Sequence, residues 1–469
     1  MSRVGQSAPE TRAEVLVVGL GVSGRAAARH LRSRGATVAV SDRRPAAELG
    51  EIIKELESLG ISEIESGGHT PEFFVNRRLI VVSPGVPLEL PALAAARKNG
   101  IEIIGEIELA CRESRLPLIG LTGTNGKTTT VTLLGEIFAA AGLKPFVGGN
   151  LGRPAVEMGD GDYDLAILEL SSFQLESIGR FHPGIAVILN LTPDHQDRYR
   201  DTAAYLAAKT AISRNQQRED FLLLNLDDPH LAAHGRALAA RRAAGDLLPR
   251  VVWFSLEQEV EYGASWRDER IIINLPPATG SGPLELAAPK LKLPGDHNRS
   301  NVLAALLVAW LRGIEESVIR QVVGRFPGVA HRLEYLGEVD GVACYNDSKA
   351  TNLDAVAKAV ASFDRPLVLL LGGSDKGADF ATLSPLLRRR RCRVVAFGAA
   401  GEKIAGQLPE LISAGPEAGL AAAWRRARAL ARPGEVILLA PGCASFDEFV
   451  NYRDRGEAFR RLVKNSTGD

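Results

Sequence analysis

The segment LIGLTGTNGKTTTVTLLGEIF, residues 118–138, restricts the possible folds of this chain more than any other part of it. An apolar stretch runs into a glycine-rich turn, then Lys127, then hydroxyl residues that open an amphipathic helix. A strand, turn and helix in this order point backbone N–H groups and a helix N-terminus at a phosphate. We therefore predict a phosphate-binding loop, in which Lys127 reaches the β- and γ-phosphates and Thr128 ligates Mg²⁺. The loop residues are Gly123, Thr124, Asn125, Gly126, Lys127, Thr128 and Thr129.

This loop departs from the general GxxxxGK[ST] pattern, because Leu121 stands five positions before Gly126. The strand before it and the helix after it still favour phosphate binding over a glycine turn with a surface lysine.

The N-terminal part of the chain carries a second phosphate pattern. Gly19, Gly21 and Gly24 form GxGxxG between an expected strand at 15–19 and an expected helix at 22–34, and Asp42 closes the next strand. Taken alone, this spacing favours NAD. The pattern cannot separate NAD from another nucleotide, because any pyrophosphate would lie on the same helix N-terminus.

Short β-branched stretches alternate with helical stretches along the whole chain, which is typical of parallel sheets covered by crossover helices. The length of 469 residues, at about 150 per domain, suggests about three domains. We predict an α/β fold of three domains: a Rossmann-like domain at 1–106, a central P-loop ATPase-like domain at 107–328 and a Rossmann-like domain at 329–469.

Composition excludes several classes of partner. Lys plus Arg and Asp plus Glu both total 56, so no net field attracts nucleic acid or an anionic membrane. No apolar run reaches the length of a membrane span, and the N-terminus lacks a signal-peptide core. We expect a cytoplasmic protein. Its four cysteines are far apart in the sequence, and we expect reduced thiols, most of them buried.

Polar side chains end two more strands of the central part. Glu169 ends the stretch at 165–170, and Asn190, Asp194 and His195 follow the stretch at 185–190. The carboxyl ends of parallel strands form the ligand site of open α/β sheets, and a carboxylate there suits a metal. Lys209, in AYLAAKTAI, is by its spacing alone a lysine on a helix surface.

Nine segments, taken together, resemble the Mur ligase family. They are GTNGKTTT (123–130), ELSSFQLE (169–176), TPDHQDR (192–198), AAK (207–209), GDHNRSN (295–301), HR (331–332), NDSKATN (346–352), GGSDKGADF (372–380) and APGCASFDEF (440–449). Several of them are shared with folylpolyglutamate synthases. The resemblance therefore implies ATP-dependent amide-bond formation more firmly than the amino acid that is added. ELSSFQLE and CASFDEF favour the branch that adds D-glutamate to UDP-N-acetylmuramoyl-L-alanine.

The resemblance also implies the residues of the ATP and metal sites. It makes Lys127, Glu169, His195 and Lys209 the catalytic group, with Thr128, Glu169, His195 and Lys209 around two Mg²⁺ ions. Lys209 would carry a CO₂-derived carbamate, which turns a repelled ammonium into an anionic oxygen ligand. The remaining ATP contacts would be Asn298 and Asn301 on one helix face, and Arg332, Asp347 and Lys349.

The substrate residues implied by the resemblance fall into two groups. The uridine diphosphate would be bound by Val22, Ser23, Asp42, Arg43 and Ser83. Asn150 would contact the muramoyl peptide, and Ser171 would also contact the substrate. Thr351, Lys376, Ser445 and Tyr452 would bind D-glutamate; Tyr452 stands where the family commonly has Phe. We expect a monomer. The alternatives are a sister ligase or folylpolyglutamate-type synthase with another amino acid, an NAD-dependent oxidoreductase, and a nucleotide-binding regulator without catalysis.

Overall fold

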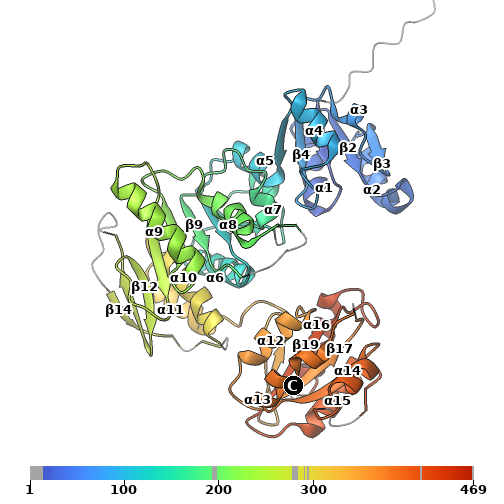
Figure 1. Ribbon diagram of the computed structural model, residues 1–469, viewed down its shortest axis with the longest axis vertical. Helices are drawn as coiled ribbons and strands as arrows, with labels where there is room; N and C mark the ends of the chain where they lie inside the picture. Colours follow the sequence, from blue (N-terminus) through green and yellow to red (C-terminus); the bar gives the residue numbers. More distant parts are fainter. Residues whose placement is uncertain are drawn as a thin grey trace, which may run out of the picture. The chain divides into compact units, whose positions relative to one another are not determined.

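The computed structural model describes residues 14–150, 152–192, 198–276, 284–289, 291–292, 295–375, 377–411 and 415–466. The chain forms two compact units. One covers the described residues within 1–267, 271–286 and 303–315, and the other covers those within 268–270, 287–302 and 316–469. Three sheets with helices against them confirm the predicted α/β fold (Figure 1).

The first sheet has the strand order β3-β2-β1-β4-β5, and every pair is parallel. Helices α1, α2 and α5 cover one face and α3 and α4 the other. The elements are β1 Val15–Val18, α1 Val22–Ser33, β2 Val38–Asp42, α2 Ala46–Ser58, β3 Ile64–Ser66, α3 Pro71–Phe74, β4 Leu79–Val82, α4 Pro91–Lys98, β5 Glu102–Gly105 and α5 Glu106–Glu113.

The central sheet has nine strands in the order β14-β13-β12-β11-β10-β9-β6-β8-β7. Its elements are β6 Leu118–Thr122, α6 Lys127–Ala140, β7 Pro145–Gly149, η1 Ala155–Gly159, β8 Leu165–Glu169, α7 Ser172–Leu175, β9 Ile185–Ile188, α8 Thr202–Thr210, η2 Ala211–Ser213, β10 Phe221–Asn225, α9 Pro229–Ala243, β11 Arg250–Ser255, β12 Gly263–Arg267, β13 Arg270–Asn274, β14 Leu284–Ala287, α10 Asp296–Leu311 and α11 Glu316–Arg325.

Strand β6 lies between β8 and β9 and is parallel to both. The carboxyl ends of these three strands, which carry the predicted phosphate and metal residues, therefore meet at one sheet edge. The predicted strand at 185–190 ends at Ile188, because Asn190 bends away to hold the phosphate loop: its carbonyl accepts from the Thr124 N–H at 3.0 Å.

Helix α5 connects the first sheet to the central one through its carboxylates. The fully buried side chain of Glu108 accepts hydrogen bonds from the backbone N–H groups of Gly179, Arg180 and Phe181. It also accepts from Arg112 Nε at 2.7 Å. The Glu106 carboxylate accepts from the Val156 N–H at 2.8 Å.

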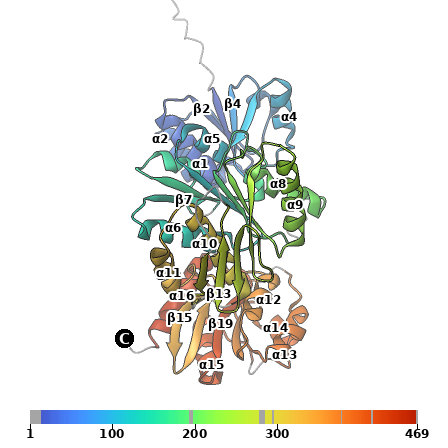
Figure 2. The ribbon, with the colours of Figure 1, turned by 90° about the vertical axis from the view of Figure 1, so that its left-hand side faces the viewer.

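The third sheet has the order β15-β16-β19-β17-β18; β15 is antiparallel to β16, and the other pairs are parallel. Helices α12, α13 and α14 pack on one face, and α15 and α16 on the other. Figure 2 shows α16 and α12 on opposite sides of this sheet. The elements are β15 Glu334–Val339, β16 Val342–Asn346, α12 Leu353–Ala361, β17 Leu367–Gly372, η4 Phe380–Leu383, α13 Ser384–Arg389, β18 Arg393–Phe397, α14 Gly401–Gln407, α15 Leu420–Leu430, β19 Val436–Gly442 and α16 Tyr452–Lys464.

The cysteine prediction is confirmed: Cys344, Cys392 and Cys443 are buried, Cys111 is half-buried, and all four are free. Among the helices that the structure describes, none is long and apolar enough to cross a membrane.

Candidate functional site

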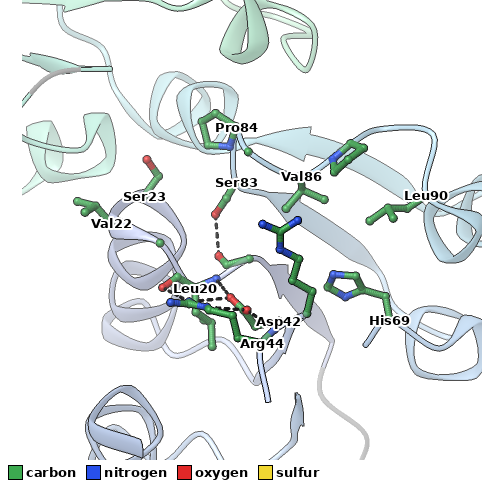
Figure 3. Close-up of a pocket in the computed structure, with 15 residues that line it drawn as sticks. Leu20, Val22, Ser23, Asp42, Arg44, His69, Ser83, Pro84, Val86 and Leu90 are labelled. Carbon is green, nitrogen blue, oxygen red and sulfur yellow. Dashed lines mark hydrogen bonds and ion pairs between the residues drawn. The ribbon is translucent and has the colours of Figure 1, made fainter. Parts of the chain in front are cut away.

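A pocket of about 570 Å³ opens at the carboxyl end of the first sheet (Figure 3). All five residues predicted to bind the uridine diphosphate line it: Val22, Ser23, Asp42, Arg43 and Ser83. The pocket wall also contains His69, which the sequence analysis did not identify. A single histidine between a short strand and a short helix carries no pattern that would have marked it.

The glycines of the first turn are required by close packing. A Cβ atom on Gly24 would lie 1.8 Å from the Gly19 carbonyl oxygen, so only glycine lets the start of α1 approach β1. Gly19 itself has φ of +84°, a conformation that favours glycine. The Ser83 hydroxyl donates to the Gly19 carbonyl at 2.7 Å and fixes the turn from β4.

Asp42 is held by its neighbours at the floor of this pocket. Its carboxylate accepts from the Leu20 N–H at 2.6 Å and from the Arg44 guanidinium at 2.9 Å. Burial alone raises the pKa of Asp42, but the hydrogen bonds from Arg44 and Leu20 outweigh it and lower the pKa to about 2. Asp42 is therefore ionised. Figure 3 shows, as dashed lines, the hydrogen bonds that hold its carboxylate to Arg44 and Leu20.

The phosphate loop has the geometry of an anion cradle. Gly126 precedes α6 with φ of +85°, and Gly123 has φ of +151°. A Cβ atom on Gly123 would meet Leu189 at 3.0 Å. The side chain of Asn190 braces the loop: its Oδ1 accepts from the Asn125 N–H at 2.8 Å, and its Nδ2 donates to the Asn125 carbonyl. These backbone conformations aim the first N–H groups of α6 outward from the strand end, which fits a phosphate.

Glu169 and Thr128 meet beside this loop, as the strand order requires. The Thr128 hydroxyl donates to Glu169 Oε2 at 2.9 Å, and the Asn150 amide donates to Glu169 Oε1 at 3.0 Å. All three come from different elements, and Glu169 is 2% exposed. A carboxylate and a hydroxyl so placed are the oxygen ligands that Mg²⁺ prefers. The Asn150 amide, predicted to contact the muramoyl peptide, also orients this carboxylate.

Two lysines reach the same carbonyl of the loop. Lys127 Nζ donates to the Gly123 carbonyl at 2.8 Å, and Lys209 Nζ donates to it at 2.9 Å. Lys209 is 2% exposed, so the helix-surface interpretation is wrong. Its Nζ lies 4.7 Å from the ring centroid of Tyr205, whose hydroxyl is 3.2 Å from Thr124 Oγ1. Tyr205 was missed, although its i, i+4 spacing from Lys209 places the two on one helix face.

The other predictions at this edge concern Ser171, Asp194 and His195. Ser171 caps α7 in a capping box with Gln174, so its hydroxyl is bonded within the chain. His195 and Asp194 lie outside the described residues. Within the described ranges, no three His, Cys, Asp or Glu side chains gather as a metal site. Of the predicted metal ligands that the structure describes, Glu169 and Thr128 form a hydrogen bond with each other.

In the second unit, two predicted ATP residues, Arg332 and Lys349, lie near a third, Asp347. Burial raises the pKa of Asp347 to about 7. The positive charges of Arg332 and Lys349 and the hydrogen bond from the Leu333 N–H lower the pKa, but by less than burial raises it. Asn298 and Asn301 are both buried on α10, at 5% and 4% exposure.

Three of the four residues predicted to bind the amino acid are described, and they follow strands of the third sheet. Ser445 is buried three residues after β19, Thr351 is half-buried between β16 and α12, and Tyr452 begins α16. Lys349 Nζ lies 5.8 Å from the Tyr452 ring centroid. Lys376 lies outside the described residues.

Three family models match the chain. They are described as Mur ligase MurD-like, N-terminal domain, at residues 13–105; Mur ligase middle domain, at 121–309; and Mur ligase, glutamate ligase domain, at 331–443.

Curated relatives match nearly the whole length. A UDP-N-acetylmuramoylalanine--D-glutamate ligase of Acidobacterium capsulatum is 46% identical over 96% of both chains. Enzymes of the same name from Koribacter versatilis and Pelotomaculum thermopropionicum are 44% and 41% identical; they match 96% and 97% of this chain and 97% and 98% of their own.

Solved structures show the same fold. MurC, the UDP-N-acetylmuramate-alanine ligase of Thermotoga maritima, has a TM-score of 0.55 at 21% identity, covering 97% of this chain and 100% of its own. MurF of Acinetobacter baumannii has a TM-score of 0.56 at 15% identity, covering 98% and 95%.

Proposed function

The chain belongs to the Mur ligase family, and from this premise we propose that it joins D-glutamate to UDP-N-acetylmuramoyl-L-alanine while converting ATP to ADP and phosphate. The observation that carries the choice of substrate is the 46% identity, over 96% of the chain, to a relative named for this reaction. The solved structure named as an alanine ligase shares the fold at 21% identity.

The chemistry requires activation of a carboxylate, because a carboxylate oxygen is a poor leaving group. The L-alanine carboxylate would attack the γ-phosphate of ATP to give an acyl phosphate and ADP. The neutral amine of D-glutamate would then attack the acyl carbon, and the tetrahedral intermediate would expel phosphate. The first step brings two anions together, which is why the phosphate loop, with Lys127 and the N-terminus of α6, is the feature of this chain best suited to it.

Mg²⁺ would supply positive charge at the transferring phosphoryl group. Thr128 and Glu169 would hold it, since their oxygens already meet at 2.9 Å, and His195 would be a further ligand. The predicted carbamate on Lys209 is supported by the shared carbonyl of Gly123. Two ammonium groups on one oxygen lie within about 6 Å of each other, where like charges repel. A carbamate on Lys209 would turn that repulsion into attraction.

The pocket of the first sheet would hold the uridine diphosphate, and the loops of the third sheet would hold D-glutamate. The domain limits 1–106, 107–328 and 329–469, a monomeric state and a cytoplasmic location are parts of the same proposal. Each domain would then bind one substrate, and all three substrates are anionic although the chain has no net charge.

The test is phosphate release by the purified chain with ATP, Mg²⁺ and UDP-N-acetylmuramoyl-L-alanine. D-glutamate, L-glutamate, L-lysine and meso-diaminopimelate are compared as acceptors. We expect release that depends on D-glutamate alone. Release with another acceptor would favour a sister ligase, and binding of NADH measured by fluorescence, with no phosphate release, would favour the oxidoreductase.

A further inference from the structure

Arg455, on α16, is one of the most deeply buried side chains of the second unit, with 1% of its surface exposed. Its guanidinium makes four hydrogen bonds. Nε donates to Ser348 Oγ at 3.0 Å, and Nη2 donates to the Ser348 carbonyl at 2.9 Å. Nη2 also donates to the Cys443 carbonyl and Nη1 to the Ala444 carbonyl, both at 3.1 Å. Within the described chain, none of its hydrogen bonds goes to a carboxylate.

These acceptors belong to two loops that are far apart in the sequence. Ser348 follows β16, and Cys443 and Ala444 follow β19. Because β19 lies between β16 and β17 in the sheet, the ends of all three strands are neighbours. One planar guanidinium therefore ties together the loops at the carboxyl edge of the sheet.

The loop after β17 joins the same assembly. The Ser374 N–H donates to the Ala444 carbonyl at 2.9 Å, and the Ala444 N–H donates to the Ser374 carbonyl at 3.0 Å. Gly373, with φ of +126°, approaches so closely that a Cβ atom there would lie 3.0 Å from Arg455 Nη1 and 2.3 Å from the Ala444 carbonyl oxygen. Three loops thus meet over Arg455.

The residues assigned to the amino acid lie on these same loops in the sequence. Thr351 is three positions after Ser348, and Ser445 directly follows Ala444. We propose that Arg455 is a positioning residue for D-glutamate: it sets the relative placement of the two loops that carry Thr351 and Ser445. The proposal rests on the function proposed above.

A stabilising role alone explains this arginine poorly. Burying a cation without a carboxylate partner is unfavourable, and an apolar side chain of similar size stabilises a core at least as well. An arginine offers five donors in a fixed plane, however, and so can set the positions of several carbonyls at once. Lysine, with one nitrogen, cannot reach all four acceptors.

The test compares Arg455→Lys and Arg455→Met with Arg390→Lys. Arg390 is a control in the same unit. It also donates to two backbone carbonyls, those of Ala361 and Phe363, and in addition pairs with the Asp364 carboxylate at 2.7 Å. All three acceptors precede β17, at the opposite edge of the sheet. The KM values for D-glutamate, ATP and UDP-N-acetylmuramoyl-L-alanine are measured for each variant, with the melting temperature as a check of folding.

We expect both Arg455 variants to raise the KM for D-glutamate about tenfold or more, with the other two KM values within about twofold. The Arg390 variant should leave all three within about twofold. A folded Arg455 variant with an unchanged KM for D-glutamate, or with equal rises in all three values, overturns the proposal. If Arg455→Met does not fold, Arg455→Lys decides. Wild-type protein without D-glutamate-dependent phosphate release would instead refute the proposed function.

Discussion

Replacing Glu108 by glutamine tests the connection that α5 makes to the central sheet. The carboxylate is fully buried and accepts from four donors, three backbone N–H groups and Arg112, at 2.7 to 3.0 Å. Burial alone raises the pKa of Glu108, but these hydrogen bonds lower it below its ordinary value, so the side chain is ionised. Glu108→Gln removes the charge and turns one acceptor oxygen into a donor.

The size of the effect follows from the two oxygens. Oε2 accepts from Gly179, Arg180 and Phe181, whereas Oε1 accepts from Arg180 and Arg112. Either orientation of the amide therefore turns its NH₂ group toward at least two donors. Hydrogen bonds to a charged group contribute about 1.5 to 3 kcal/mol each, so we expect a loss of about 3 kcal/mol or more. That corresponds to a fall of roughly 6 to 12 °C in the melting temperature.

Thermal unfolding followed by circular dichroism, and hydrogen exchange of the Gly179 to Phe181 amides, measure this loss. Glu102→Gln is the control, since Glu102 bonds the same arginine but its side chain is 54% exposed. An exposed ion pair contributes at most about 1 kcal/mol. If Glu108→Gln lowers the melting temperature no more than Glu102→Gln, and does not speed exchange of these amides, the reasoning is wrong.

The same comparison has a predicted pH dependence. Because the folded pKa of Glu108 is depressed, its contribution is present above the unfolded carboxyl pKa of about 4.3 and is lost as the pH falls through the folded value. The difference in stability between wild type and Glu108→Gln should therefore be constant from pH 8 to pH 6 and shrink below about pH 4.

Three further predictions concern single positions. Burial raises the pKa of Glu106 to about 7, so ionisation of this carboxyl group opposes folding at high pH. Calorimetry should therefore give Glu106→Gln a higher melting temperature than wild type at pH 8 and the same melting temperature at pH 4. Gly24→Ala should prevent folding of the first domain or raise the KM for the UDP substrate about tenfold or more, whereas Gly21→Ala, with nothing within 4 Å of its new Cβ, should melt like wild type. Glu169→Gln should keep the melting temperature within a few degrees of wild type but lower kcat/KM about 100-fold or more, because an amide is a poor Mg²⁺ ligand. Full recovery of activity in excess Mg²⁺ would show that the substitution weakens metal binding alone.

Much of the molecule was predictable because the information is local. The phosphate loop lies within twelve consecutive residues from Leu118, and its strand, glycine turn and helix start are each a property of neighbouring residues. The turn of Gly19, Gly21 and Gly24 is local in the same way, as are the strands β1 and β8, which were predicted at 15–19 and 165–170, within a residue of their observed ends. The family motifs are also contiguous, so the resemblance could be read from the sequence.

The tertiary structure decided which segments that are distant in the sequence come into contact. Arg455 meets Ser348 across 107 positions, Lys209 meets Gly123 across 86, and Glu108 meets the Gly179 loop across 71. No periodicity records such pairs, because they depend on the order of strands in the sheets. Lys209 is the clearest case: a lysine among apolar helix neighbours is usually exposed, and only the packing of α8 beside the phosphate loop buries it. The sequence by itself determined the alternation of strands and helices and the two glycine-rich phosphate turns at 19–24 and 123–129, because each depends on neighbouring residues. The strand order determined which loop ends face one another.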